Sequence, residues 1–95
     1  VSGTTEELAG VTLYEIFSPA SVLADGAIDP ALARRLLGEN ATYKFGAWEI
    51  SGKNLYFGGK VPAGISASHF EALVNTVAST ADDMEKELTP GKDDL

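Results

Sequence analysis

The chain contains no cysteine, and it has only one histidine, one tryptophan and one methionine among its 95 residues. Without cysteine there are no disulfides and no thiolate metal sites, which fits a reducing cytoplasm. Basic residues are also scarce, with seven lysines and arginines against fourteen acidic residues and a net charge of −7. Because phosphate contacts need clustered lysine and arginine, this balance argues against a nucleic-acid partner. An acidic surface promotes solubility, and it can also steer a basic partner.

Long apolar runs are missing as well. No segment approaches the roughly 20 apolar residues of a membrane span, and no basic-then-apolar signal peptide is present. We therefore expect no membrane partner and a cytoplasmic location. The hydrophobic fraction of 44% predicts one folded domain over residues 1–95 rather than a disordered chain. Such a short chain buries only roughly 60–65% of its unfolded surface, so self-association would stabilise it. Because the first residue is Val1 rather than methionine, we expect a domain that is short at its N-terminus.

The clearest pattern predicts a long helix from about Ser66 to Leu88. An apolar stripe on one helical face must be covered, and the preceding residues predict a small β-sheet that can cover it. The residues of this stripe recur at steps of one, three or four and so share one face: Phe70, Leu73, Val74, Val77, Ala81, Met84 and Leu88.

Two signals compete for the start of this helix. Ser68 and Glu71 have the spacing of a capping box. A cap at Ser66 would instead make Ile65 and Phe70 a hydrophobic staple. Both alternatives begin the helix within two residues of Ser66.

Shorter elements are expected before it. Residues 1–10 contain a capping pattern at 4–7 and predict a frayed helical turn, or the end of a longer helix. Residues 11–17 are rich in β-branched and aromatic side chains, and they predict a strand that ends at Ser18-Pro19 because proline cannot donate to the ladder. A turn is expected at 24–26.

A second helix is predicted to start at Asp29-Pro30. Aspartate accepts hydrogen bonds from the free amides of a first turn, and proline at the first helical position needs no donor. The helix is expected to end near Gly38. Its inward residues are expected to be Leu32, Ala33, Leu36 and Leu37.

Two strands, 41–50 and 54–61, are predicted to form a hairpin through a tight turn at 51–54. The apolar phase of the first strand changes around Gly46-Ala47, which indicates a β-bulge or, alternatively, a flat two-faced strand. Gly58-Gly59 in the second strand indicates the close approach of another backbone or a large side chain. The whole order predicts an α+β domain with helices on one face of a small antiparallel sheet. Residues 89–95 are expected to form a mobile tail.

No constellation for chemistry is visible. His69 has no second histidine, cysteine or activated serine near it in the sequence, so we interpret it as a surface residue. The acidic run Asp82, Asp83 and Glu85 points in different helical directions and indicates a solvated face rather than a metal site. We therefore expect no catalytic residues, no metal, no cofactor and no enzymatic activity.

The aromatic residues offer a different possibility. Tyr43, Trp48 and Tyr56 are either part of the core or mark an exposed sheet surface. If they are exposed as a group, they form a protein-binding patch.

Four segments between residues 31 and 88 carry a family resemblance. They are Leu36-Leu37-Gly38-Glu39-Asn40, Lys44-Phe45-Gly46-Ala47-Trp48-Glu49-Ile50, Leu55 to Val61 followed by Pro62, and Ala81-Asp82 with Leu88. Together they resemble the YbjN-type domain of bacteria, which is similar to the class I type III secretion chaperones. The resemblance covers about two-thirds of the chain. It departs from the family where a full first helix would normally stand.

The resemblance implies a type III secretion chaperone-like fold and a homodimer that binds segments of other proteins. YbjN-type proteins are described as sensory or stress-related regulators, with no catalytic residues to transfer. Our leading hypothesis is a chaperone-like homodimer that takes a protein segment by apolar contacts and strand addition. Its expected contact residues are Trp48, Tyr56 and Phe57, with Tyr43 behind them. The alternative is a small-molecule-sensing regulatory domain cut from a larger chain, with an apolar cavity between the long helix and the sheet.

Overall fold

The computed structural model describes residues 2–88, apart from the side chain at position 25. Residues 89–95, for which a mobile tail is expected, lie outside the described residues. The elements in chain order are β1 (Ser2–Leu8), β2 (Val11–Val22), a 3-10 turn (Ala24–Gly26), α1 (Pro30–Asn40), β3 (Ala47–Ser51), β4 (Asn54–Pro62) and α2 (Ala67–Leu88).

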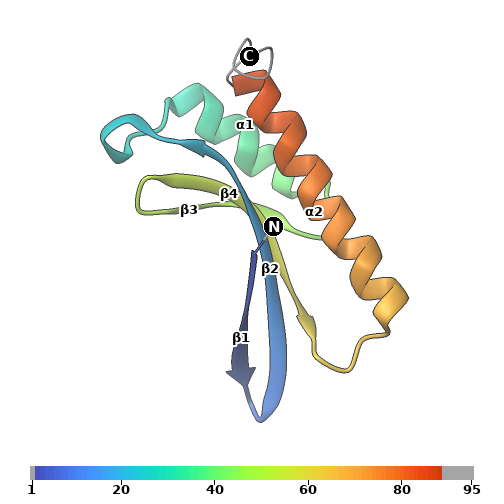
Figure 1. Cartoon of the computed structure of the whole chain (residues 1–95). Coiled ribbons are helices and arrows are strands. Elements are labelled where there is room, and N and C mark those ends of the chain that lie inside the picture. Colours follow the sequence, from blue (N-terminus) through green and yellow to red (C-terminus); the bar gives the residue numbers. More distant parts are fainter. Residues whose placement is uncertain (1, 89–95) are drawn as a thin grey trace.

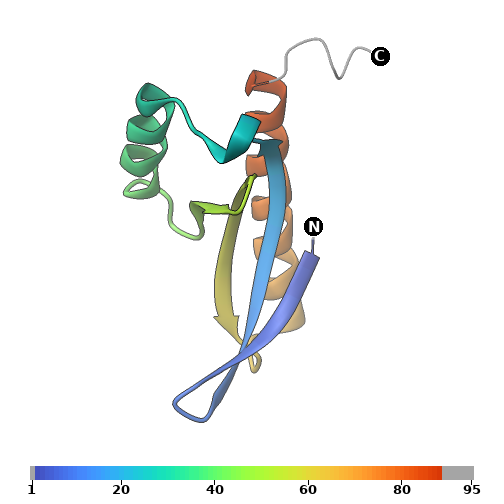
Figure 2. The same cartoon turned by 90° about the vertical axis from the view of Figure 1, so that its left-hand side faces the viewer.

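The four strands form one antiparallel sheet in the order β1-β2-β4-β3. The helix α2 packs across β2 and β4, while α1 lies against β3 near the C-terminal end of α2 (Figure 1). The other face of the sheet is turned toward the viewer in Figure 2, where α2 lies behind the strands. This arrangement confirms the expected α+β fold, a small antiparallel sheet packed by a long C-terminal helix and a short helix. Within residues 2–88, neither helix is long and apolar enough to cross a membrane.

The start of α2 is fixed by Ser66. The backbone N–H of His69 donates to Ser66 Oγ at 3.3 Å, so the cap is at Ser66 and not at Ser68. Ile65 and Phe70, the two staple positions, both pack against the core. The apolar stripe faces the sheet as expected, and its most deeply buried members are Val77, Ala81 and Met84.

The core lies between the helices and one side of the sheet. It is formed by alternate residues of the strands together with one leucine of α1, namely Ile16, Leu55, Phe57, Val61, Trp48 and Leu36. A Cβ at Gly58 would lie 2.9 Å from the carbonyl oxygen of Ile16, and one at Gly59 would lie 2.6 Å from the ring of Phe45. Both glycines therefore permit the close approach that their place in the strand predicted.

Residues 2–8 form a strand, and the predicted helical turn is wrong. The strand β1 pairs with β2 along its whole length, from Ser2 opposite Phe17 to Leu8 opposite Val11. Ala9 and Gly10 both have positive φ values, 51° and 81°, which suits a two-residue hairpin turn. The pairing gives ladder bonds to alternate residues of a short, threonine-rich segment, whereas an isolated helical turn is unstable.

The strand β2 continues through Ser18-Pro19 to Val22, beyond the predicted end. Its register against β4 shifts between Pro19 and Ser21. The residue between them has no partner on β4, which is a β-bulge. The strand β1 reaches only Phe17, and among residues 2–88 Pro19 is therefore paired on the β4 side alone. Proline is tolerated at such edge positions.

The predicted start of α1 is confirmed. The predicted set of inward-facing residues is only partly confirmed. Leu32 N–H donates to Asp29 Oδ2 at 3.3 Å, with Pro30 in the first helical position. The helix runs on to Asn40. Leu36 is buried, whereas Leu37 is 71% exposed, so the expectation that Leu37 points inward is wrong.

The strand predicted for residues 41–50 is shorter, because it begins only at Ala47. Gly46 has a φ of 91° and turns the chain into β3 at the position of the predicted phase change. The hairpin turn at 51–54 and the strand from Asn54 are confirmed, with Gly52 at a φ of 59°.

Candidate interaction surfaces

The first candidate surface is the free edge of β1. In an antiparallel hairpin with a two-residue turn, backbone groups point alternately toward the partner strand and away from it. Counting from the closing pair Leu8 and Val11, the N–H and C=O groups of Gly3, Thr5 and Glu7 point away from β2. Within residues 2–88 no strand pairs with this edge. It contains no proline, lysine or bulge, and its only charged side chains are Glu6 and Glu7 near its C-terminal end.

An apolar hollow adjoins this edge. Because α2 packs over β2 and β4, the helix-facing side of β1 is left uncovered. The hollow there has a volume of about 530 Å³. The ring of Tyr14 packs edge-on against Phe70 across it, with centroids 5.7 Å apart. Its main lining residues are Gly3 and Thr5 from β1, Tyr14 and Ile16 from β2, and Phe70 and Val74 from α2.

The second candidate surface is the face of the sheet that α2 does not cover (Figure 2), which we call the open face. Here the rings of Phe17 and Tyr56 meet edge-on with centroids 5.7 Å apart and an interplanar angle of 64°. A hollow of about 430 Å³ lies around them. Its lining residues are Ser2, Glu15, Phe17, Pro19, Ser51, Asn54 and Tyr56.

One carboxylate, Glu15, lines the open-face hollow, and Glu6 and Glu49 lie on the same side of the sheet. Lys60 Nζ lies 2.7 Å from Glu6 Oε2, and this hydrogen bond is the main cause of the raised pKa of Lys60. Glu15 accepts a hydrogen bond from Thr4 Oγ1 at 3.4 Å. Burial, followed by the charges of Glu49 and Glu15, raises the pKa of the Tyr56 phenol. These carboxylates therefore act electrostatically on the aromatic centre of the open face.

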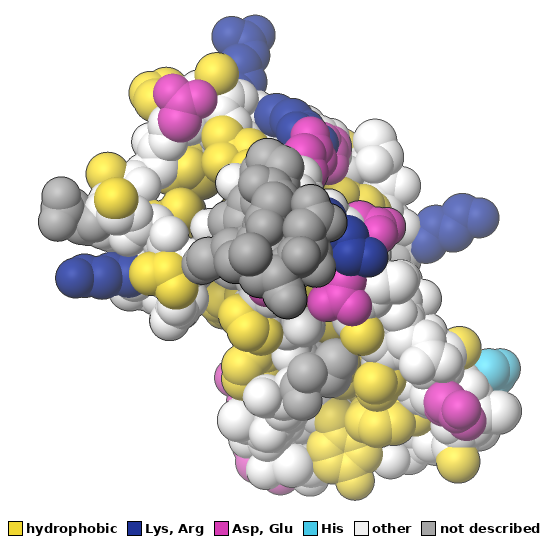
Figure 3. All heavy atoms as spheres, turned by 45° about the horizontal axis from the view of Figure 1, so that its top comes forward, with side chains coloured by type: hydrophobic (Ala, Val, Ile, Leu, Met, Phe, Trp, Pro, Cys, Tyr) yellow, Lys and Arg dark blue, Asp and Glu magenta, His cyan; other side chains and the backbone are white. Residues whose placement is uncertain are grey.

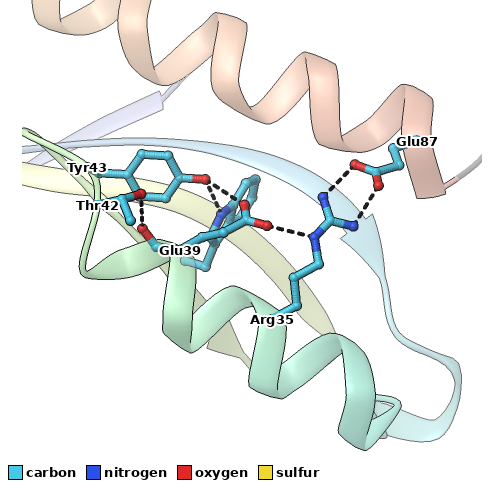
Figure 4. A network of polar contacts seen from close by, with 6 residues as sticks. Arg35, Glu39, Thr42, Tyr43 and Glu87 are labelled. Atoms are coloured by element: carbon cyan, nitrogen blue, oxygen red, sulfur yellow. Dashed lines mark hydrogen bonds and ion pairs between the residues drawn. The ribbon is translucent and has the colours of Figure 1, made fainter.

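A polar network joins α1 to α2 (Figure 4). The Arg35 guanidinium donates to both carboxylate oxygens of Glu87 at 2.6 and 2.9 Å, and its Nε donates to Glu39 at 2.6 Å. The bond to Arg35 lowers the pKa of Glu87. Tyr43 OH donates to Glu39 at 3.0 Å and accepts from the indole N–H of Trp48 at 3.0 Å. This network links α1 to α2 and to the start of β3. The pKa of Tyr43 is raised, mainly because its phenol is partly buried.

The surface around this network is chemically mixed. In the view of Figure 3, acidic and basic side chains are interspersed over the end of the molecule that holds α1 and the C-terminal part of α2. Apolar side chains are exposed among them. Leu37 and Ile50 are exposed, and they border a small groove of about 210 Å³ between α1 and β3.

The edge of β3 is occupied by a side chain of α1. Asn40 Oδ1 accepts from the backbone N–H of Trp48 at 2.6 Å, and Asn40 Nδ2 donates to the carbonyl of Trp48 at 3.2 Å. The amide thus makes the two bonds that a neighbouring strand would make at this residue. Asn40 belongs to the Leu-Leu…Asn motif of the sequence, but its contact with β3 depends on where α1 docks.

The four aromatic residues expected to form one exposed binding surface do not lie together on it. Trp48 is 6% exposed and Phe57 is 0% exposed, so the expectation of exposure is wrong for both. Tyr43 packs against Phe57 on the helix side of the sheet, with centroids 4.9 Å apart. Tyr56 alone lies on the open face, beside Phe17.

Sequence reasoning missed Phe17 and Glu15 as surface candidates. Their alternation along the strand indicated that they share a face. It could not show that this face is uncovered, because that depends on which side of β2 receives α2.

The polar side chains that could have carried chemistry are at the surface. His69 is exposed, as are Asp82, Asp83 and Glu85 on α2. Over the described range 2–88, no group of three or more histidine, cysteine or acidic side chains is placed to hold a metal ion.

No protein-family model matches the sequence, and no curated protein is significantly similar to it.

Proposed function

We propose that this chain is a non-enzymatic protein-interaction module that associates through the free edge of β1. The observation that supports the proposal most strongly is a seven-residue edge strand with unpaired backbone groups beside an apolar hollow. Backbone hydrogen bonds at such an edge give affinity, and side-chain pockets beside it give specificity. The resemblance to YbjN-type domains supports a chaperone-like or regulatory role, and the absence of cysteine supports a cytoplasmic location.

A second copy of the chain fits this edge, and we include a homodimer in the proposal. When two β1 strands pair antiparallel about Thr5, Gly3 lies opposite Glu7 of the second copy and Thr4 lies opposite Glu6. No carboxylate then faces another carboxylate, and the two central threonines form a favourable cross-strand pair. The result is one continuous sheet through both copies. The excess of acidic residues argues against nucleic acid as the partner.

The pairing is tested by a single engineered cysteine, because the natural chain has none. In the paired strands the two Thr5 Cα atoms would be about 5.5 Å apart, a separation that a disulfide spans. We expect Thr5→Cys to form a disulfide-linked dimer under mild oxidation. The matched control is Ser51→Cys, an exposed position on the opposite edge strand, which we expect to stay monomeric on a non-reducing gel.

The second measurement is molar mass by light scattering over a dilution series. We expect a dimer that dissociates on dilution, and a monomer for Thr5→Pro. The Thr5 N–H points away from β2, so proline removes an edge donor while every ladder bond to β2 remains. A monomer at all concentrations, with equal cross-linking of both cysteine variants, would contradict the homodimer.

A second candidate function is a small-molecule-sensing regulatory domain. It is favoured by the hollow between α2 and β1, whose volume of about 530 Å³ is within the range of ligand pockets. A metabolite at about 100 times its Kd would stabilise the fold by about 2.7 kcal/mol. The test is a thermal-shift screen of wild type and of Val74→Trp, which fills the hollow. A shift in wild type that Val74→Trp abolishes supports this function, and a flat screen counts against it.

A further inference from the structure

The open face combines an aromatic pair with an excess of negative charge. Tyr56 and Phe17 form its centre, with ring centroids 5.7 Å apart. Glu49 lies directly opposite Tyr56 on β3, and Glu15 is two positions before Phe17 and so shares its face of β2. The aromatic centre is therefore flanked by a carboxylate on each side.

Among the described residues this face has one lysine, Lys60, which lies directly opposite Glu15 but forms its ion pair with Glu6. Register places Glu6, Glu15, Glu49 and Lys60 on the open side of the four strands. Lys60 is held by Glu6 at 2.7 Å, while no ion pair to Glu15 or Glu49 is found in the part of the chain that the structure describes. These four residues carry three negative charges and one positive charge, so this face is negative overall. Glu15 and Glu49 are the two carboxylates that border the aromatic pair.

We propose that the open-face hollow binds the guanidinium group of an arginine in an extended basic segment of a partner protein. A planar guanidinium can stack on an aromatic ring and donate in pairs to carboxylates, and it is less strongly hydrated than the ammonium of lysine. The hollow of about 430 Å³ has room for such a side chain. An anionic segment would be repelled, and an apolar side chain would bring no countercharge to the two flanking carboxylates.

This surface lies on the side of the sheet opposite α2, so it stays accessible whether or not β1 pairs with a second copy. The proposal adds a partner chemistry to the interaction module proposed above. Its test does not involve the β1 edge, so the two proposals can fail separately.

The experiment is an NMR titration of the whole 95-residue chain with two probes. One is a pentapeptide with a single arginine between glycine and serine residues. The other is the same peptide with citrulline, which has nearly the same shape and no charge. We expect the arginine peptide to shift the signals of Tyr56 and Phe17, and the citrulline peptide to bind roughly five- to tenfold more weakly.

Variants then assign the site. Tyr56→Leu removes the stacking ring, and the double variant Glu15→Gln with Glu49→Gln removes the flanking charges. We expect each to weaken arginine binding, while the control Glu71→Gln, an exposed residue of α2, leaves it unchanged. Amide spectra of each variant establish that the fold is retained.

Three results would overturn the proposal. The first is equal binding of the arginine and citrulline peptides. The second is a shift map centred on the acidic side of α2, which would indicate general attraction to an acidic chain. The third is unchanged affinity in a folded double variant. Under any of these the interaction module and its β1 edge remain testable by cross-linking.

Discussion

Gly58 allows β2 and β4 to lie in contact at the centre of the sheet. A Cβ at this position would come within 2.9 Å of the Ile16 carbonyl oxygen and 3.0 Å of the Phe17 Cβ. Backbone and Cβ atoms cannot rotate away, so the strands themselves would have to move. We expect Gly58→Ala to lower the free energy of unfolding by about 1–3 kcal/mol, measured by urea titration.

The control for this prediction is Gly64→Ala. A Cβ at Gly64 meets no atom within 4 Å, so we expect a change of less than about 0.5 kcal/mol. Equal stability of both variants would mean that β2 and β4 are less closely packed at this point.

Single residues also show where sequence reasoning reached its limit. The Gly58-Gly59 pair was correctly predicted to admit close contacts, because glycine weakens a strand and often marks a point where another chain segment comes close. That Trp48 and Phe57 are buried could not be predicted from their being aromatic. Alternation along a strand separates its two faces, but only the position of α2 decides which face is buried.

The helices were more predictable than the strands for a physical reason. Caps and apolar periodicity are local, so Ser66 and Asp29 fixed both helix starts. Strand pairing is non-local, and nothing within residues 2–8 indicates that β2 will pair with them. The bulge after Pro19 similarly depends on β4. The free β1 edge and the open face follow from these pairings, so the sequence alone did not locate either surface.

The contact between α1 and α2 should depend on pH through Glu87. Its bond to Arg35 lowers its pKa from an ordinary value of 4.5. A lowered carboxyl pKa contributes stability that is present above the ordinary value and is lost as pH falls through the folded-state value. We expect Glu87→Gln to be less stable than wild type at neutral pH, and the difference to shrink as pH falls below 4.5.

Both partners of this ion pair are about half exposed, so salt should weaken it. Thermal melts at several pH values and salt concentrations measure the difference. Glu71→Gln is the control, because no ion pair of Glu71 is found among the described residues. A wild-type advantage that persists at low pH would show that the charge of Glu87 is not its source.

The stability of the molecule as a whole should depend on its concentration. If the copies pair through β1, mass action favours the folded dimer, and the melting temperature falls on dilution. For a domain of this size we expect a fall of roughly 5–10 °C over a hundredfold dilution. Calorimetry on wild type and Thr5→Pro makes the comparison. An identical, concentration-independent melting temperature for both would contradict the pairing.

The side chain of Asn40 on the edge of β3 bears on how far the proposed association can proceed. A sheet with two exposed edges is a monomer with two reactive ends, and such monomers polymerise into filaments. Asn40 occupies the outward backbone groups of Trp48 on the edge of β3, so if copies pair through β1 we expect assembly to stop at two copies. We therefore expect Asn40→Ala to be about 1–3 kcal/mol less stable and, in light scattering, to form species larger than a dimer, whereas Asn75→Ala, at an exposed position of α2, forms none. Under this prediction a single amide decides between a finite complex and an open-ended fibre.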